Sequence, residues 1–349
     1  MKVISFLRFP LCVIVVLIHT AITIDNNWLQ ISLSHVLSQV AVPSFFFFSG
    51  YLFFLNFNIF TFKGFVAKLR RRFYSLLIPY VLWISIWILI KSFFVWSIHG
   101  SILDYFQLHS WLDIWHLYWD SSYFMVDNYD WLGNPAYMTA PYLVPLWYLR
   151  DLMVVCTMSP FIYYAIKKNS FFFVAFLGIA YMTHIWPIHT GLTIIALFWF
   201  SLGAFFSINK IDYVTTISSI GKYSYLPTLF FFIVEMYYDG SHTPIGFIIH
   251  PFYVISMFVT LICFSAMIVD KCKPNDCLSK SSFFVYISHG VFISYVTLFV
   301  NHLIPSSSYL QLMVKYFLVP TITICISLCI YMFISSHSKL LLKVLSGNR

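Results

Sequence analysis

The chain has 349 residues, of which 60% are hydrophobic and only 9% are charged. A soluble domain carries about 25% charged residues, so this composition excludes a soluble protein and places most of the chain in a membrane. The formal net charge is +8, but most of the basic residues gather in short segments between apolar stretches. That distribution reports the orientation of a membrane protein and argues against nucleic acid as a partner.

Ten apolar stretches predict membrane-spanning helices, because a helix needs about 20 residues to cross a bilayer. The fifth, seventh and ninth stretches are short. The pattern predicts an all-α polytopic membrane protein with one integral-membrane domain over 1–349, a long outer loop at about 98–142 and no soluble domain. The predicted spans are about 3–24, 31–55, 73–97, 143–166, 170–187, 190–208, 223–238, 248–269, 283–300 and 312–334.

Lys and Arg residues are distributed unevenly over the segments that join these spans. All but four of the 20 lie in alternate segments or at the two ends of the chain, and the intervening segments hold essentially none. Because basic residues are enriched on the cytoplasmic side, both termini are predicted to be cytoplasmic. The four exceptions, which lie within or at the edges of spans, are Arg8, Lys91, Arg150 and Lys315.

The first span carries two ionisable residues, Arg8 and His19, with ten apolar residues between them. Such groups are costly inside a membrane and often mark a reaction site or a pathway. On a helix they project from one face, about 16 Å apart along the axis, although Pro10 makes this geometry approximate. Arg8 is either an anchor at the membrane surface or a clamp for the phosphate of a cytoplasmic donor. His19 is either a hydrogen-bonded structural residue or a general base or acyl carrier.

The second span and the basic segment after it carry weaker signals. Ser49 and Gly50 in the second span permit close approach of a neighbouring helix. The segment from Lys68 to Arg72 is predicted to be a cytoplasmic loop, which either sets the topology or adds charge for an anionic donor. The arginines of this segment are Arg70, Arg71 and Arg72.

The predicted outer loop at about 98–142 contains five Asp residues, many aromatic residues and no Lys or Arg. One interpretation is an aromatic belt with helices lying at the membrane surface. The other is a platform for a sugar, because aromatic rings stack on carbohydrate faces and Asp accepts hydrogen bonds from hydroxyl groups.

The fourth span opens near Trp147 and carries Arg150 and Asp151 close to the expected depth of His19. Neighbouring residues on a helix point about 100° apart, so Arg150 and Asp151 are not expected to satisfy each other. Each then needs a partner from another helix, and Glu235 in the seventh span is the candidate partner of Arg150. A purely structural ion pair between spans remains an alternative.

Together these features resemble the membrane-bound acyltransferase-3 family, bacterial enzymes that O-acylate cell-surface carbohydrates. The similarity extends from the first span into the ninth, and the chain resembles family members without an appended esterase-like domain. The matching features are Arg8 and His19 at their spacing, Phe46-Phe47-Phe48-Ser49-Gly50-Tyr51, the basic run before Pro79, Pro145-Leu146-Trp147-Tyr148-Leu149-Arg150 and Tyr286-Ile287-Ser288-His289.

The resemblance implies an inner-membrane O-acyltransferase that moves an acyl group, commonly acetyl, from cytoplasmic acyl-CoA to a hydroxyl of a cell-surface or lipid-linked carbohydrate. The implied acceptor is a polysaccharide of the exopolysaccharide, capsule or O-antigen type. The expected partners are membrane lipid, acyl-CoA as co-substrate and the carbohydrate. No bound cofactor and no metal site are expected.

Roles for individual residues follow from this hypothesis. Arg8, helped by Arg70 to Arg72, is expected to hold the CoA phosphates. His19 is expected to deprotonate the acceptor hydroxyl or to take the acyl group briefly. Arg150 is expected to orient the acceptor or to stabilise the oxyanion.

The remaining candidate residues have weaker assignments. His289 is either a residue that lines the donor channel or a buried, hydrogen-bonded structural histidine. Asp151, Glu235 and Trp147 are placed on the acceptor side. Two other classes of protein remain open, namely a flippase or exporter of lipid-linked sugars and a structural partner in a polysaccharide assembly complex.

Overall fold

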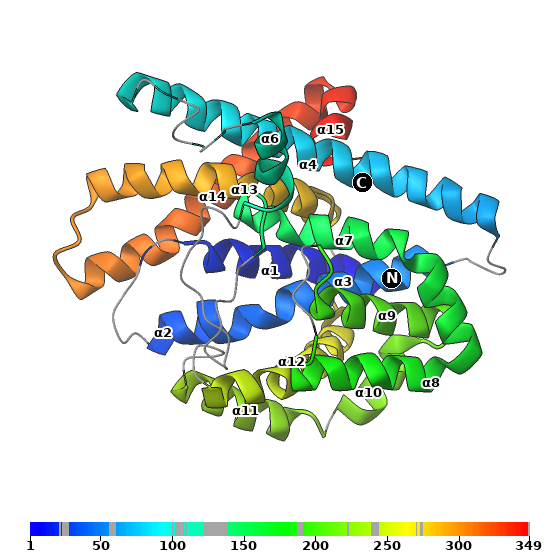
Figure 1. Ribbon diagram of the computed structural model, residues 1–349. Coiled ribbons are helices and arrows are strands. Elements are labelled where there is room, and N and C mark those ends of the chain that lie inside the picture. The colour runs from blue at the N-terminus through cyan, green and yellow to red at the C-terminus, as the bar shows by residue number, and fades with distance from the viewer. Residues whose placement is uncertain are drawn as a thin grey trace.

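The computed structural model consists of helices, and no strand occurs in the part of the chain that it describes (Figure 1). The predicted all-α class is therefore confirmed. The structure describes residues 1–20, 22, 28–55, 61–99, 101, 106, 108, 110–121, 139–186, 191–221, 223–238, 244–269, 271–272 and 275–347.

The N-terminal helix α1 (Lys2–Ile18) runs through the middle of the helix bundle (Figure 1). It packs most extensively along α13 (Asp276–Leu303), and it also contacts α3 (Ala41–Phe54) and α12 (Pro244–Val269). Pro10 lies inside α1 without ending it. Because other helices pack around α1, Arg8 on this helix and His19 at its end face protein rather than lipid.

The chain enters α3 through three short helical segments of different geometry. They are α2 (Trp28–Gln30), the π-helix η1 (Ile31–Val36) and the 3-10 helix η2 (Leu37–Val40). Together with α3 they form one candidate span over Trp28–Phe54. This span matches the second predicted stretch closely.

Helix α3 crosses α9 (Ile194–Ile208) at close range through two glycines. A Cβ atom at Gly50 would collide with the backbone of Phe200, and one at Gly203 would collide with the backbone of Phe47. Only glycine fits at these two positions, since any side chain would push the helices apart. The prediction that Gly50 permits close helix approach is confirmed.

Helix α4 (Phe62–His99) is long and contains the basic segment from Lys68 to Arg72. The prediction of a loop at this segment is wrong. Lys, Leu and Arg are good helix formers, and no helix-breaking residue precedes Pro79 in this region. The basic side chains are consequently spaced along a helix instead of a flexible loop.

Helix α6 (Trp111–Trp119) comes from the predicted outer loop and packs against the middle of α4. The hydroxyl of Tyr80 donates a hydrogen bond to the backbone carbonyl of Tyr118, and Ser85 Oγ lies 2.8 Å from Tyr118 Oη. This part of the predicted loop therefore reaches the body of the bundle. Most of the other aromatic residues of the loop, in 122–138, lie outside the described residues.

The fourth and fifth predicted spans fall on η4 (Val144–Leu146), α7 (Trp147–Thr157) and α8 (Ser159–Thr183). Asn169 inside α8 has non-helical backbone angles, with φ −150° and ψ 69°, and marks a kink. The kink lies between the two predicted stretches. The remaining helices are α10 (Tyr213–Gly221), α11 (Tyr225–Tyr237), α14 (Tyr309–His337) and α15 (Lys339–Ser346).

Six described helical segments are long and apolar enough to cross a membrane, or seven if α9 and α10, which are bent by 111°, form one span. The protein is therefore a multi-pass membrane protein. Each of the ten predicted stretches coincides with helix, but α1, α7 and α11 contain only 17, 11 and 13 residues. The count of ten stays a prediction. The N-terminus lies toward the right-hand end of the bundle in Figure 1.

Candidate functional site

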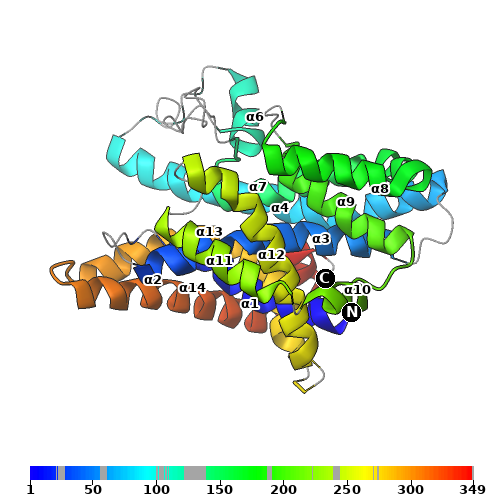
Figure 2. The ribbon, with the colours of Figure 1, turned by 90° about the horizontal axis from the view of Figure 1, so that it is seen from below.

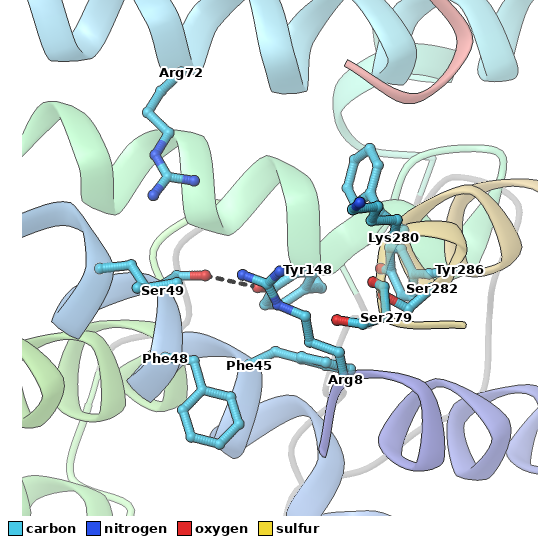
Figure 3. A pocket seen from close by; sticks show the side chains of 12 residues that line it. Arg8, Phe45, Phe48, Ser49, Arg72, Tyr148, Ser279, Lys280, Ser282 and Tyr286 are labelled. Carbon is cyan, nitrogen blue, oxygen red and sulfur yellow. Dashed lines mark hydrogen bonds between the residues drawn. The ribbon is translucent and has the colours of Figure 1, made fainter. Parts of the chain in front are cut away.

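A cavity of about 260 Å³ lies among α1, α3, α4, α7 and α13 (Figure 3). Arg8, Arg72 and Lys280 line it from three different helices, and none of the described lining residues is acidic. Figure 3 shows the guanidinium groups of Arg8 and Arg72 directed toward the same space. Like charges repel, so this arrangement favours an anionic ligand between them. We term this space the cationic cavity.

Hydroxyl groups and a helix N-terminus add further anion-binding groups to the cationic cavity. Ser279 and Ser282 line it from the start of α13, and Ser49 Oγ lies 3.2 Å from the hydroxyl of Tyr148 (Figure 3). Asn275 caps α13 by accepting two backbone N–H bonds of the first turn, at 2.9 and 3.2 Å. The positive end of the α13 dipole is therefore close to the cavity.

A series of ring contacts leads from the cationic cavity to two histidines. The ring centres of Tyr148 and Tyr286, which both line the cavity, are 5.7 Å apart. The ring of His289 lies 5.8 Å from that of Tyr286, and the ring of His19 lies 5.3 Å from that of His289. The tertiary fold thus brings together His19 and His289, which are far apart in the sequence.

One nitrogen of His289 has a defined role. The residue is fully buried, and its Nδ1 forms a hydrogen bond with the backbone carbonyl of Tyr286. A carbonyl can only accept, so Nδ1 carries the proton and Nε2 keeps a free lone pair. Nε2 has no hydrogen-bond partner among the described residues. His289 is therefore a buried base next to His19.

Arg8 and His19 both face α13, as their helical spacing predicts. Arg8 lines the cationic cavity together with α13 residues, and the His19 ring contacts His289 of α13. The cavity reaches Tyr286, but its described lining residues do not include His19. The described lining of this cavity therefore reaches Arg8 but not His19. The two positions are connected through the rings of Tyr286 and His289.

Arg150 and Asp151 form an ion pair with each other, and both are fully buried. Nε and Nη2 of Arg150 donate to Oδ1 of Asp151 at 3.0 and 2.9 Å. The prediction that Arg150 and Asp151 do not satisfy each other is wrong. The long arginine side chain bends back to its neighbour even though the two Cβ atoms point in different directions.

The other bonds of this ion pair join separate parts of the chain. Arg150 donates to the backbone carbonyls of Trp119 and Thr139 at 2.7 and 2.8 Å, and Thr193 donates to Oδ2 of Asp151 at 2.8 Å. The pair therefore fastens the end of α6 and the start of α9 to α7. This geometry gives Arg150 a structural role.

Glu235 belongs to a different polar pair. It is fully buried on α11, and its Oε2 lies 3.3 Å from Nδ1 of His250 on α12. The expected partnership between Glu235 and Arg150 is therefore wrong. Adjacent helices α11 and α12 supply both members of the observed pair, and Arg150 is already bound to Asp151.

The other predicted donor and acceptor residues lie in different surroundings. Arg72 lines the cationic cavity, and Arg71 lines an adjoining second cavity. Arg70 lies over the ring of Tyr74, 5.9 Å from its centroid, and lines neither of these two cavities. Trp147 packs against an aromatic residue of α3 and also lines neither cavity.

Sequence reasoning missed the contribution of the first turns of α13. In the sequence, Lys280 is one of the basic residues that indicate membrane orientation, and that pattern gives no role to the serines near it. A usable signal is present, because polar residues recur at three- and four-residue intervals and so share one face of the helix. The residues of this face are Ser279, Ser282, Tyr286 and His289.

The class of this protein follows from its match to a known family. The profile of the acyltransferase-3 family, described as an acyltransferase domain, matches residues 2–332. The chain belongs to the acyltransferase-3 family. It is therefore a membrane acyltransferase, an enzyme that transfers a group other than an aminoacyl group. The flippase alternative is not favoured. No curated protein and no solved structure was found to match the chain.

Proposed function

We propose that this acyltransferase moves an acyl group, acetyl in the simplest case, from cytoplasmic acyl-CoA to a hydroxyl of a cell-surface or lipid-linked carbohydrate at a bacterial inner membrane. The cationic cavity is the observation that carries the proposal. It presents three cations and no described acidic residue to a ligand, which suits the phosphates of CoA. Arg72 and Lys280 belong to segments that the distribution of basic residues assigns to the cytoplasm in a protein of ten spans.

In this proposal the cationic cavity holds the diphosphate of CoA. The guanidinium groups of Arg8 and Arg72 bind phosphate oxygens, and Lys280 adds a third positive charge. The pantetheine arm then extends past Tyr286 toward His289 and His19. Tyr286 lies at this boundary and must shift to admit the thioester.

His19 acts as the general base in the proposed transfer. It accepts the proton of the acceptor hydroxyl while that oxygen attacks the thioester carbonyl, and the tetrahedral intermediate expels the CoA thiolate. The thiolate then takes the proton from the imidazolium, so the products are an ester and free CoA. His289 is held by its bond to the Tyr286 carbonyl, and its ring lies next to that of His19. As the neighbouring base, it positions this proton or passes it on.

The acceptor side is proposed to involve the aromatic residues of α6. A cavity of about 490 Å³ between α4 and α6 is lined by Tyr80, Trp115, Tyr118 and Trp119 together with aliphatic side chains. Such rings stack on sugar faces or contact an apolar lipid carrier. Asp151 and Glu235 already have protein partners, so we do not extend the acceptor role to them.

Transfer from labelled acetyl-CoA tests this function directly. Purified protein in nanodiscs is incubated with radiolabelled acetyl-CoA and with membranes of cells that lack the gene. We expect label in a carbohydrate ester with the native protein and a loss of about 100-fold or more in kcat with His19→Ala. Arg8→Ala should raise the KM for acetyl-CoA about tenfold or more, because a charged hydrogen bond to phosphate is lost.

A control separates failure of chemistry from failure of folding. Arg70→Ala removes a cation that lines neither cavity and should leave the KM for acetyl-CoA near the native value. Thermal melting midpoints of all variants are measured in parallel. Transfer at the native rate by correctly folded His19→Ala protein would refute the assigned base.

A further inference from the structure

A second cavity of about 840 Å³ lies beside the cationic cavity, between α4 and the C-terminal helix α15. The two cavities share Leu52 and Arg72. Arg71 and Lys343 also line the second cavity, and none of its described lining residues is acidic. We term it the α15 cavity.

Helix α15 is held against α4 at a defined place (Figure 1). Trp83 Nε1 donates a hydrogen bond to the backbone carbonyl of Leu345 at 3.0 Å. Gly347, which follows α15, has φ 66° and lies so close to Ser75 that a Cβ atom would collide with its backbone. Lys343 is therefore presented on a wall of the cavity whose backbone is fixed, while its own side chain is exposed.

The basic residues of the α15 cavity differ in what they already bind. Lys68 donates to two backbone carbonyls near the end of α3, at 2.6 and 3.2 Å, so its ammonium group has protein partners. The side chains of Arg71, Arg72 and Lys343 form no hydrogen bond or ion pair with the described residues. Three cations without a balancing carboxylate among the described lining residues form a site for a phosphate group.

The shared Arg72 indicates which phosphate this is. The diphosphate of CoA lies in the cationic cavity if the proposed function holds, and the thioester points away from α15 toward the histidines. The nucleotide end of the donor then extends in the opposite direction, past Arg72. That end carries a phosphate monoester on the 3′-oxygen of the ribose.

We propose that the α15 cavity binds the nucleotide end of the acyl-CoA donor and that Lys343, with Arg71, recognises its 3′-phosphate. The proposal rests on the proposed function. Helix α15 lies beyond residues 2–332, which the family profile matches, so the family match gives this helix no role. Lys343 is then a specificity residue for CoA over donors that lack the 3′-phosphate.

Binding of acetyl-CoA is compared with that of acetyl-dephospho-CoA, which lacks only the 3′-phosphate. Equilibrium dialysis with protein in zwitterionic nanodiscs measures Kd for the native chain and for Lys343→Gln, Lys343→Arg and Lys339→Gln. The native protein should prefer acetyl-CoA about tenfold or more. Lys343→Gln should abolish most of this preference, and Lys343→Arg should restore it. Lys339→Gln is the matched control, since Lys339 lies on the same helix but does not line the cavity.

The outcomes separate the inference from the proposed function. Acetyl transfer without any preference for the 3′-phosphate, or a preference unchanged in Lys343→Gln, would overturn the inference alone. A Lys343-dependent preference without transfer would support the inference and contradict the proposed function. Repeating the measurement with phosphatidylglycerol in the nanodiscs tests the competing occupant. Acetyl-CoA binding that is unaffected by Lys343→Gln, together with phosphatidylglycerol binding that requires Lys343, would assign the cavity to a lipid headgroup.

Discussion

A single hydrogen bond gives His289 its chemical character. The bond from Nδ1 to the Tyr286 carbonyl leaves Nε2 unprotonated and without a described partner, 5.3 Å from His19 between ring centres. Asparagine at this position retains a side-chain amide that can donate to the same carbonyl, but it lacks the basic nitrogen. His289→Asn thus separates the structural role from the chemical one.

For His289→Asn we expect kcat to fall about 100-fold while the KM for acetyl-CoA changes little, because proton transfer is impaired and the cationic cavity is untouched. Steady-state kinetics with purified protein measure both constants, and a thermal melt checks the fold. Activity near the native level would show that His289 serves only to pack the two helices.

The Arg150–Asp151 pair is expected to stabilise the fold, because each buried charge depends on the other for its compensation. Removing one member leaves a buried charge without its partner, which costs about 3–5 kcal/mol. Arg150→Met and Asp151→Leu should each lower the melting midpoint strongly. The double variant should lose less than the sum of the two, since no lone charge remains. Melting in detergent provides the comparison, and strictly additive losses would contradict the coupling.

At the scale of elements, the α3–α9 crossing depends on the absence of two Cβ atoms. We expect Gly50→Ala and Gly203→Ala to destabilise the fold by about 1–3 kcal/mol, because each new methyl group meets backbone that cannot rotate away. Gly178→Ala is the control, since its Cβ would meet only ring atoms of Phe198 at 3.3 Å. Melting midpoints in one detergent rank the three variants. Equal losses would indicate that the crossing is looser than the structure shows.

Local sequence determined most of the elements and part of the site. Long apolar stretches predicted the helix positions well, because burial in lipid leaves a continuous hydrophobic signal. Arg8 and Arg72 were recognised by their charge. The prediction of a loop at Lys68–Arg72 is wrong because it treats a run of basic residues as the boundary of a membrane span. These residues in fact favour helix.

Contacts between distant helices were beyond the reach of sequence reasoning. The approach of His19 to His289 and the place of Lys280 in the cationic cavity depend on how α1 packs along α13. The partner predicted for Arg150 is wrong because the prediction rests on the direction in which helix residues point. The arginine side chain is long enough to reach Asp151 in spite of that direction. These features depend on how distant helices pack in three dimensions. The sequence gives one indication of this packing, namely the polar face of α13.

At the scale of the whole molecule, exposed free cysteines can report the orientation of the protein in the membrane. Cys272 and Cys277 are exposed near the start of α13, in a segment whose lysines predict a cytoplasmic location. A membrane-impermeant maleimide should label them in inside-out vesicles and not in intact cells. Cys272→Ser/Cys277→Ser protein is the control for labelling elsewhere. Labelling from outside intact cells would reverse the orientation and place the cationic cavity on the wrong side for acyl-CoA.

The central position of α1 constrains the order in which this enzyme is made. Cys12 of α1 donates a hydrogen bond to the backbone carbonyl of Ser282, and 270 positions separate the two residues. At a synthesis rate of about 5–20 residues per second, α1 leaves the ribosome more than about 10 s before α13 exists to cover it. During that interval Arg8 and His19 remain in the bilayer or at its surface without their neighbours on α13. A nascent chain stalled before α13 should therefore be inserted yet unable to bind its donor.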